Sequence, residues 1–205
     1  MVRSKPESAL PRRLRSRSAP TRATRRMADT ASAFLAAWSN FYVLIGTSAA
    51  ALTGLMFVVI TLVTRTERAE GDTHAGISTF STPTVMHFAT ALLISAVLVA
   101  PWRSLVQAGV VIALIGFYGV GHILRVMLRT RRLTFYTADF EDWTWYTILP
   151  FVAYGSISGG AIALAGAPVK AMFTLAGGVV LLIFIGIRNA WDIVTYIVIK
   201  RPSPS

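Results

Sequence analysis

Apolar residues along this chain fall into five long runs separated by short polar stretches. The runs cover approximately residues 41–63, 84–100, 105–128, 147–165 and 170–200. Each run is close to or above the ~20 residues that an α-helix needs to cross the hydrocarbon core of a bilayer, where the backbone must satisfy its own hydrogen bonds. The pattern therefore predicts an all-α fold, a polytopic membrane helical bundle with five transmembrane helices.

The polar stretches between the runs predict how the helices connect. Residues 101–104 and 166–169 are four-residue turns, which favour two helical hairpins, span two with three and span four with five, packed beside the first span. The segment 129–146, between spans three and four, mixes aromatic and carboxylate side chains and is typical of a segment lying in the membrane interface. Residues 30–201 are expected to form one transmembrane domain, with a C-terminal tail at 202–205.

Small residues recur every four positions in the first span, at Gly46, Ala50 and Gly54. Residues four apart share one face of a helix. Small side chains on such a face let a neighbouring transmembrane helix approach closely. We therefore expect these three residues to form a helix-packing face.

The composition agrees with a membrane protein: 54% of the residues are hydrophobic and only 14% are charged, against about a quarter charged in soluble domains. The absence of cysteine excludes disulfides and cysteine metal sites. The formal net charge of +11 is uneven, because nine of the twenty Lys and Arg residues lie in the first 26 positions. The positive charge is thus concentrated in the N-terminal tail and does not characterise a folded domain. We therefore expect no nucleic-acid partner.

Residues 1–29 are rich in Arg, Ser and Pro, and we expect a disordered basic tail because they cannot form a core. Three functional interpretations compete with this one: an arm that binds anionic lipids, an organellar transit peptide, and a twin-arginine signal. A fourth is that translation starts at Met27, directly before the first apolar run.

The loop charges predict the orientation, since Lys and Arg are retained on the cytoplasmic side. The loops on the side of the C-terminus hold seven: Arg65, Arg68, Arg129, Arg131, Arg132, Lys200 and Arg201. The opposite loops hold only Arg103 and Lys170. The C-terminus is therefore predicted to be cytoplasmic. The basic tail contradicts this orientation, and a start at Met27 or cleavage of the tail would remove the contradiction.

Ionisable residues within the spans form a candidate polar cluster in one half of the membrane: His87, His122, Arg125, Arg188 and Asp192. Such residues are costly in a membrane, usually face the bundle interior and often mark functional sites. We expect Asp192 to be paired with Arg188 on its own helix or with Arg125 from span three. Two interpretations remain open, a structural clamp between helices and a polar cavity that binds a ligand or ion. Arg125 near a helix end also fits simple snorkelling to the interface.

Catalytic and metal-binding motifs are missing from the sequence. It contains no nucleophile elbow, phosphate loop or HExxH motif, and the histidines lack metal-ligand spacing. We therefore expect a protein that is not an enzyme and that holds no cofactor or metal.

Both ends of the apolar region resemble a known family. Residues 41–58, with FYVLIG and ALTGLMFV, look like the opening of small bacterial multi-pass membrane proteins of unknown function, and IRNAWD at 187–192 resembles the ending of that family. Some relatives are labelled modulators of a membrane-anchored AAA protease. The resemblance implies a multi-pass protein of the bacterial inner membrane and supplies no active residues.

Two functional hypotheses follow. The first is a non-enzymatic structural, regulatory or partner-binding membrane protein, whose partners are bilayer lipids, a second copy of the chain or another membrane protein. The second is a small ion or proton channel or transporter that uses the intramembrane His, Arg and Asp residues.

Overall fold

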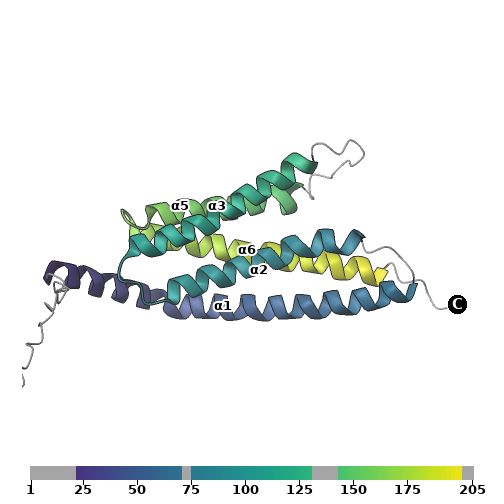
Figure 1. Cartoon of the computed structure of the whole chain (residues 1–205), viewed down its shortest axis with the longest axis horizontal. Helices are drawn as coiled ribbons and strands as arrows, with labels where there is room; N and C mark the ends of the chain where they lie inside the picture. Colours follow the sequence, from purple (N-terminus) through teal and green to yellow (C-terminus); the bar gives the residue numbers. More distant parts are fainter. Residues whose placement is uncertain (1–21, 71–74, 131–142, 200–205) are drawn as a thin grey trace, which may run out of the picture.

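The computed structural model describes residues 22–70, 75–130 and 143–199, and nearly all of them are helical. The elements are α1 (Arg22–Glu70), α2 (Ala75–Val99), α3 (Leu105–Thr130), η1 (Thr144–Ile148), α5 (Leu149–Ala163) and α6 (Pro168–Ile199). The helices run side by side along one long axis (Figure 1). The predicted all-α bundle is confirmed for this part of the chain.

Four helical stretches are long and apolar enough to cross a membrane: Asp29–Thr61, Leu105–Leu128, Thr144–Ala163 and Pro168–Thr195. The apolar stretch found in α2, Pro83–Val99, is shorter. The outer faces of the helices are apolar as well. Leu44 is 65% exposed, Leu114 67% and Phe173 65%. Large apolar side chains facing outward suit contact with lipid and are uncommon on a soluble monomer.

The order of the helices in space differs from their order in the chain. α2 packs along α1 and α6, whereas α5 packs along α6 and α3. The predicted hairpin of spans four and five is present as α5 and α6. The prediction that spans two and three pack together as a hairpin is wrong. α3 contacts α5 much more extensively than it contacts α2. The short turn connects α2 to α3 without determining which neighbour α3 packs against.

Glycines on α3 explain why α3 packs on α5. A Cβ at Gly109 would stand 2.8 Å from the carbonyl oxygen of Ala161, and one at Gly116 would stand 3.0 Å from the backbone nitrogen of Ser158. Real Cβ atoms essentially never approach closer than 3.0 Å. At Gly109 the two backbones therefore come together at a distance that only glycine permits.

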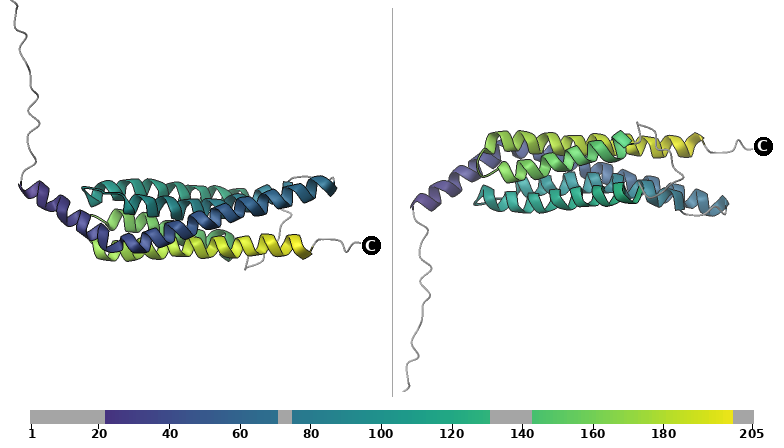
Figure 2. Two further views of the ribbon diagram at one scale, coloured as in Figure 1. Left: turned by 90° about the horizontal axis from the view of Figure 1, so that it is seen from below. Right: turned by 90° about the horizontal axis from the view of Figure 1, so that it is seen from above.

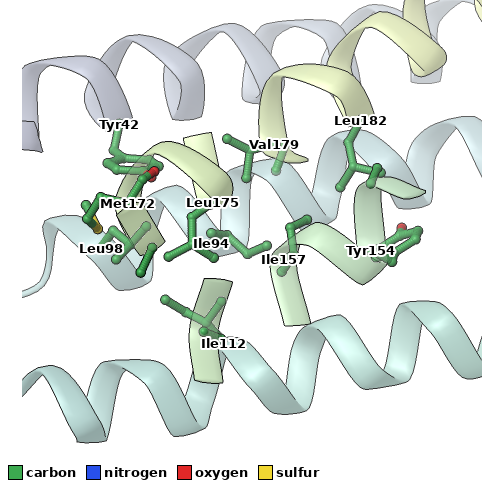
Figure 3. Packing of buried hydrophobic residues seen from close by; sticks show 14 of the residues in the cluster. Tyr42, Ile94, Leu98, Ile112, Tyr154, Ile157, Met172, Leu175, Val179 and Leu182 are labelled. Atoms are coloured by element: carbon green, nitrogen blue, oxygen red, sulfur yellow. The ribbon is translucent and has the colours of Figure 1, made fainter. Parts of the chain in front are cut away.

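The core is a continuous layer of buried apolar side chains contributed by all five long helices. Figure 3 shows its central part, where Ile94 of α2, Ile112 of α3, Ile157 of α5 and Leu175 of α6 converge. All four side chains are fully buried. Close packing of this kind fixes the neighbours of each helix and their rotation about their axes.

The predicted packing face of the first span is only partly used within the bundle. Gly46 lies against α2, where an added Cβ would stand 3.1 Å from the Cβ of Ser95. Ala50 is exposed, and a Cβ at Gly54 would have no neighbour within 4 Å. Two of the three small residues therefore face away from the remaining helices.

The ends of several segments differ from the sequence prediction. α1 already begins at Arg22, ahead of the boundary predicted at residue 30, and residues 1–21 lie outside the described residues. The N-terminal part of α1 bends away from the bundle (Figure 2). Most of the predicted interfacial segment, 131–142, and the predicted tail 202–205 also lie outside the described residues.

The fourth span begins earlier than the predicted residue 147. η1 starts at Thr144 and continues directly into α5, with helical backbone angles at Leu149. Pro150 stands near the start of α5. Proline has no N–H and its ring clashes with the carbonyl four residues earlier, so a local change of hydrogen bonding in the preceding turn accommodates it. This accounts for the single π-helical turn before α5.

Candidate functional site

Three polar residues follow one face of α2 at intervals of three positions: Thr84, His87 and Thr90. Their exposed fractions are 0%, 2% and 8%. Residues three apart on a helix lie on the same side. This face of α2 is directed into the bundle, so α2 contributes a buried polar line to a mostly apolar interior.

Tyr154 of α5 provides the partner for this line. Its phenol oxygen lies 3.1 Å from Nδ1 of His87 and 3.4 Å from Oγ1 of Thr90. The tyrosine itself is 1% exposed, and it lies at one end of the apolar cluster in Figure 3. Its ring occupies the space where a Cβ on Gly119 of α3 would stand. One side chain thus connects α5, α2 and α3.

Arg188 and Asp192 form an ion pair one turn apart on α6. Their side chains are 33% and 36% exposed, so the pair lies at the edge of the bundle. The guanidinium carbon of Arg188 lies 5.7 Å from the ring centroid of Trp145 in η1, within the range of a cation–π contact. Of the two arginines predicted to pair with Asp192, the structure selects Arg188 and adds a contact that attaches α6 to η1.

The other predicted members of the cluster lie on α3. His122 is half-buried, whereas Arg125 is exposed. Among the side chains that the structure describes, no acidic group is seen to pair with Arg125. Arg125 follows Gly119 by six residues, which turns it about 120° away from the face that packs on α5.

The described contacts divide the predicted polar residues into two bonded groups. The structure joins His87 to Tyr154 and Thr90 in the interior, and joins Arg188 to Asp192 at the edge of the bundle. Arg125 belongs to neither group. Besides its ion pair with Asp192, Arg188 contacts Trp145, so this charge pair links α6 to η1.

Three buried polar residues, Tyr154, Thr90 and Asn189, were not among the candidate site residues selected from the sequence. Tyr154 and Thr90 complete the hydrogen-bonded group around His87. Asn189 is 1% exposed, and neither its amide nitrogen nor its amide oxygen has a hydrogen-bond partner within the described part of the chain. Tyr154 could have been selected from the sequence, because it lies inside an apolar run and a buried phenol usually has a hydrogen-bond partner. The burial of Asn189 depends on helix rotation, which its neighbours in sequence do not reveal.

The chemistry available to these groups is limited. The described residues contain no group of three or more His, Cys, Asp and Glu that could hold a metal ion. His87 is committed to Tyr154, and the only acidic side chain of α6 is committed to Arg188. The arrangement can hold helices together and bind small hydrogen-bonding molecules.

Comparisons with known proteins add no further assignment. No family model matches this chain, and neither a curated protein nor a solved structure matches it. The function must therefore be argued from the residues themselves.

Proposed function

We propose that this chain is a non-enzymatic membrane protein with five spanning helices, which acts by binding another transmembrane helix. α2 supplies the fifth span in this proposal. Its 25 residues correspond to about 37 Å of helix, enough for a hydrocarbon core of about 30 Å. It packs along α1 and α6, two of the helices that contain a longer apolar stretch.

The observation that carries the proposal is the uncovered part of the α1 face. Ala50 is exposed and Gly54 has open space around it, although both belong to the four-residue spacing typical of close helix contacts. A shallow groove of about 370 Å³ lies between α1 and α2 and reaches Ala50. Its lining includes Gly46, Thr47 and Ala50 from α1. A helix laid along this groove would meet small side chains that permit close backbone approach.

A second copy of this chain is the partner that we propose. Two identical faces can pair about a twofold axis, so that the same small residues meet from both sides. Right-handed pairs of transmembrane helices commonly use such spacing. Bilayer lipids would surround the remaining apolar faces.

Introduced cysteines can test this, because the sequence contains none. An Ala50→Cys variant in native membranes should form a disulfide-linked dimer under mild oxidation. A Leu114→Cys variant, on an equally lipid-accessible face of α3, should not. If Ala50→Cys stays monomeric but purifies with a stoichiometric membrane protein, the partner is a different chain. If neither is found, α1 has no partner helix and the proposal is wrong.

Localisation and orientation follow from the loop charges. α1, α3 and α6 end, and α2 begins, at the same end of the bundle (Figure 1), which supports counting their flanking arginines and lysines together. We place this end in the bacterial cytoplasm, because its loops hold seven positive residues against two in the loops at the opposite end, with the basic residues before Met27 left out of the count. The resemblance of both ends of the apolar region to small bacterial membrane proteins supports the inner membrane as the location.

A small ion or proton channel or transporter is the second candidate. The buried His87, together with Thr84 and Thr90, favours it because polar groups inside a membrane bundle often mark a pathway. Against it, His87 and Thr90 bond to Tyr154, and the charges of α6 neutralise each other. Proton or cation flux in proteoliposomes, abolished in Asn189→Leu and retained in Leu114→Ala, would favour this candidate over the first.

A further inference from the structure

Asn189 is the least satisfied polar side chain in the interior of the bundle. It is 1% exposed, and its amide nitrogen and amide oxygen both lack partners among the residues that the structure describes. Desolvating an amide without replacing its hydrogen bonds is unfavourable, and buried polar groups almost always have a protein or water partner. Ser95 is similarly buried and unpartnered, but it offers a single hydroxyl group.

The register between α6 and α2 locates Asn189. Gly186 of α6 lies against the ring of Phe88 of α2, and the two helices run in opposite directions (Figure 1). Asn189 is three residues further along α6, so it lies beside the turn of α2 that precedes Phe88. That turn contains Thr84 and His87, which are 0% and 2% exposed. The amide therefore continues the buried polar line of α2.

The charge around Asn189 limits the kind of ligand. Arg188 and Asp192 bracket it in sequence and pair with each other, so their charges compensate. An ion would therefore find no net opposite charge on this part of α6. The carboxamide offers two N–H donors and one acceptor oxygen. The matching ligand is a neutral molecule that both donates and accepts hydrogen bonds.

Burial limits the size of the ligand. The side chain of Asn189 lies inside the bundle, and Phe88, 1% exposed, lies against Gly186, three residues before Asn189 on α6. We propose that Asn189 holds ordered water between α6 and α2, and that this water extends the polar line formed by Thr84, His87 and Thr90. Arg188 and Asp192, each about one-third exposed, lie within one turn of Asn189 on α6.

Hydroxyl-radical labelling in intact membranes tests this proposal, because radiolysis of ordered water oxidises the side chains next to it. Phe88 should be labelled in the wild-type protein despite its burial. The label should be lost in Asn189→Leu, which replaces the amide with an apolar group of similar size. It should persist in Ser95→Ala, the matched change at the other unpartnered polar residue.

A second measurement keeps the test decisive if Asn189→Leu does not fold. In the wild-type chain, rapid mixing with oxygen-18 water before irradiation should place the heavy isotope on Phe88 more slowly than on the exposed Phe173. Slow exchange identifies water that is held, and fast exchange identifies bulk solvent. Absence of label on Phe88 in the wild type, or equal labelling of Phe88 in the wild type and a folded Asn189→Leu variant, would overturn the proposal.

Discussion

The phenol oxygen of Tyr154 lies 3.1 Å from Nδ1 of His87, so a hydrogen bond inside the bundle joins α5 to α2. The two residues are 67 positions apart in the chain. The same phenol oxygen lies 3.4 Å from Oγ1 of Thr90, so it contacts two side chains of α2. The stability of the bundle should therefore respond to changes at this one oxygen.

Tyr154→Phe removes the phenol oxygen and leaves His87 and Thr90 buried without their partner. An unsatisfied buried polar group costs about 1–3 kcal/mol. We expect a lower thermal unfolding midpoint in detergent, read by circular dichroism or scanning fluorimetry. Tyr118→Phe, at a 63% exposed tyrosine of α3, is the control and should change little. Adding His87→Leu to Tyr154→Phe should recover part of the loss, and no recovery would show that the hydrogen bond is not what Tyr154 contributes.

Gly119→Ala should destabilise the bundle because its Cβ would meet the ring of Tyr154. Overpacking a core by one group costs about 1–3 kcal/mol. Gly121→Ala, two residues away on the same helix, would meet nothing within 4 Å. It should be neutral or stabilising by about 0.5–1 kcal/mol, because alanine favours helix. Thermal unfolding of the two variants side by side checks the prediction, and equal midpoints would contradict the close contact of α3 with α5.

Asp192→Asn should lower stability more than Arg103→Gln, which changes only an exposed turn residue. The loss should stay below the about 3–5 kcal/mol expected for breaking a fully buried pair, because Arg188 and Asp192 are each about one-third exposed. The double variant Asp192→Asn with Arg188→Gln should recover part of it. An additional test replaces Arg125 in the Asp192→Asn background. Better rescue by Arg125→Gln than by Arg188→Gln would refute the pairing on α6.

Gly54→Leu separates folding from association. Because a side chain at Gly54 has open space around it, the monomer should keep its unfolding midpoint. The same side chain would obstruct a helix lying on this face, so the Ala50→Cys cross-link should weaken. Gly121→Leu, also in open space but on α3, should leave the cross-link intact. A cross-link that is equally strong in both backgrounds would place the interface elsewhere.

Reporter fusions check the proposed topology. With the C-terminus in the cytoplasm, a fused fluorescent protein should be bright and a fused alkaline phosphatase inactive. Phosphatase inserted in the turn at residues 101–104 should be active, because that turn lies at the opposite end of the bundle from the end of α6 (Figure 1). The reverse pattern would invert the molecule in the membrane.

The apolar runs predicted the helices well, since length and composition alone decide whether a segment is helical in a membrane. The apolar runs did not predict which helices pack against one another. A four-residue turn suggested that spans two and three pair, but Gly109 and Gly116 bring α3 against α5 instead. The spacing of glycines predicts which face of a helix makes a close contact, but it does not predict which helix packs against that face.

The polar residues show a second limit. His87, Arg188 and Asp192 were visible because ionisable residues are rare in apolar runs. The sequence did not show which of these residues contact one another. α3 is apolar on most of its surface, so its sequence does not reveal how the helix is rotated about its axis. Arg125 thus appeared to belong with them, although the structure exposes it. Tyr154 and Asn189 resemble ordinary core or helix residues until the fold brings them beside α2.

The position of α6 bears on how the protein is made. α6 packs against both α2 and α5, yet it follows them in the chain. While the ribosome is still producing α5, α6 is not yet present to cover the polar face of α2. Until then, that face contacts the lipid or the insertion machinery. Closure of the bundle is consequently a late event in biogenesis. Nascent chains that stall before α6 would leave α2 without one of its two main packing partners, a surface that membrane quality-control proteases can recognise.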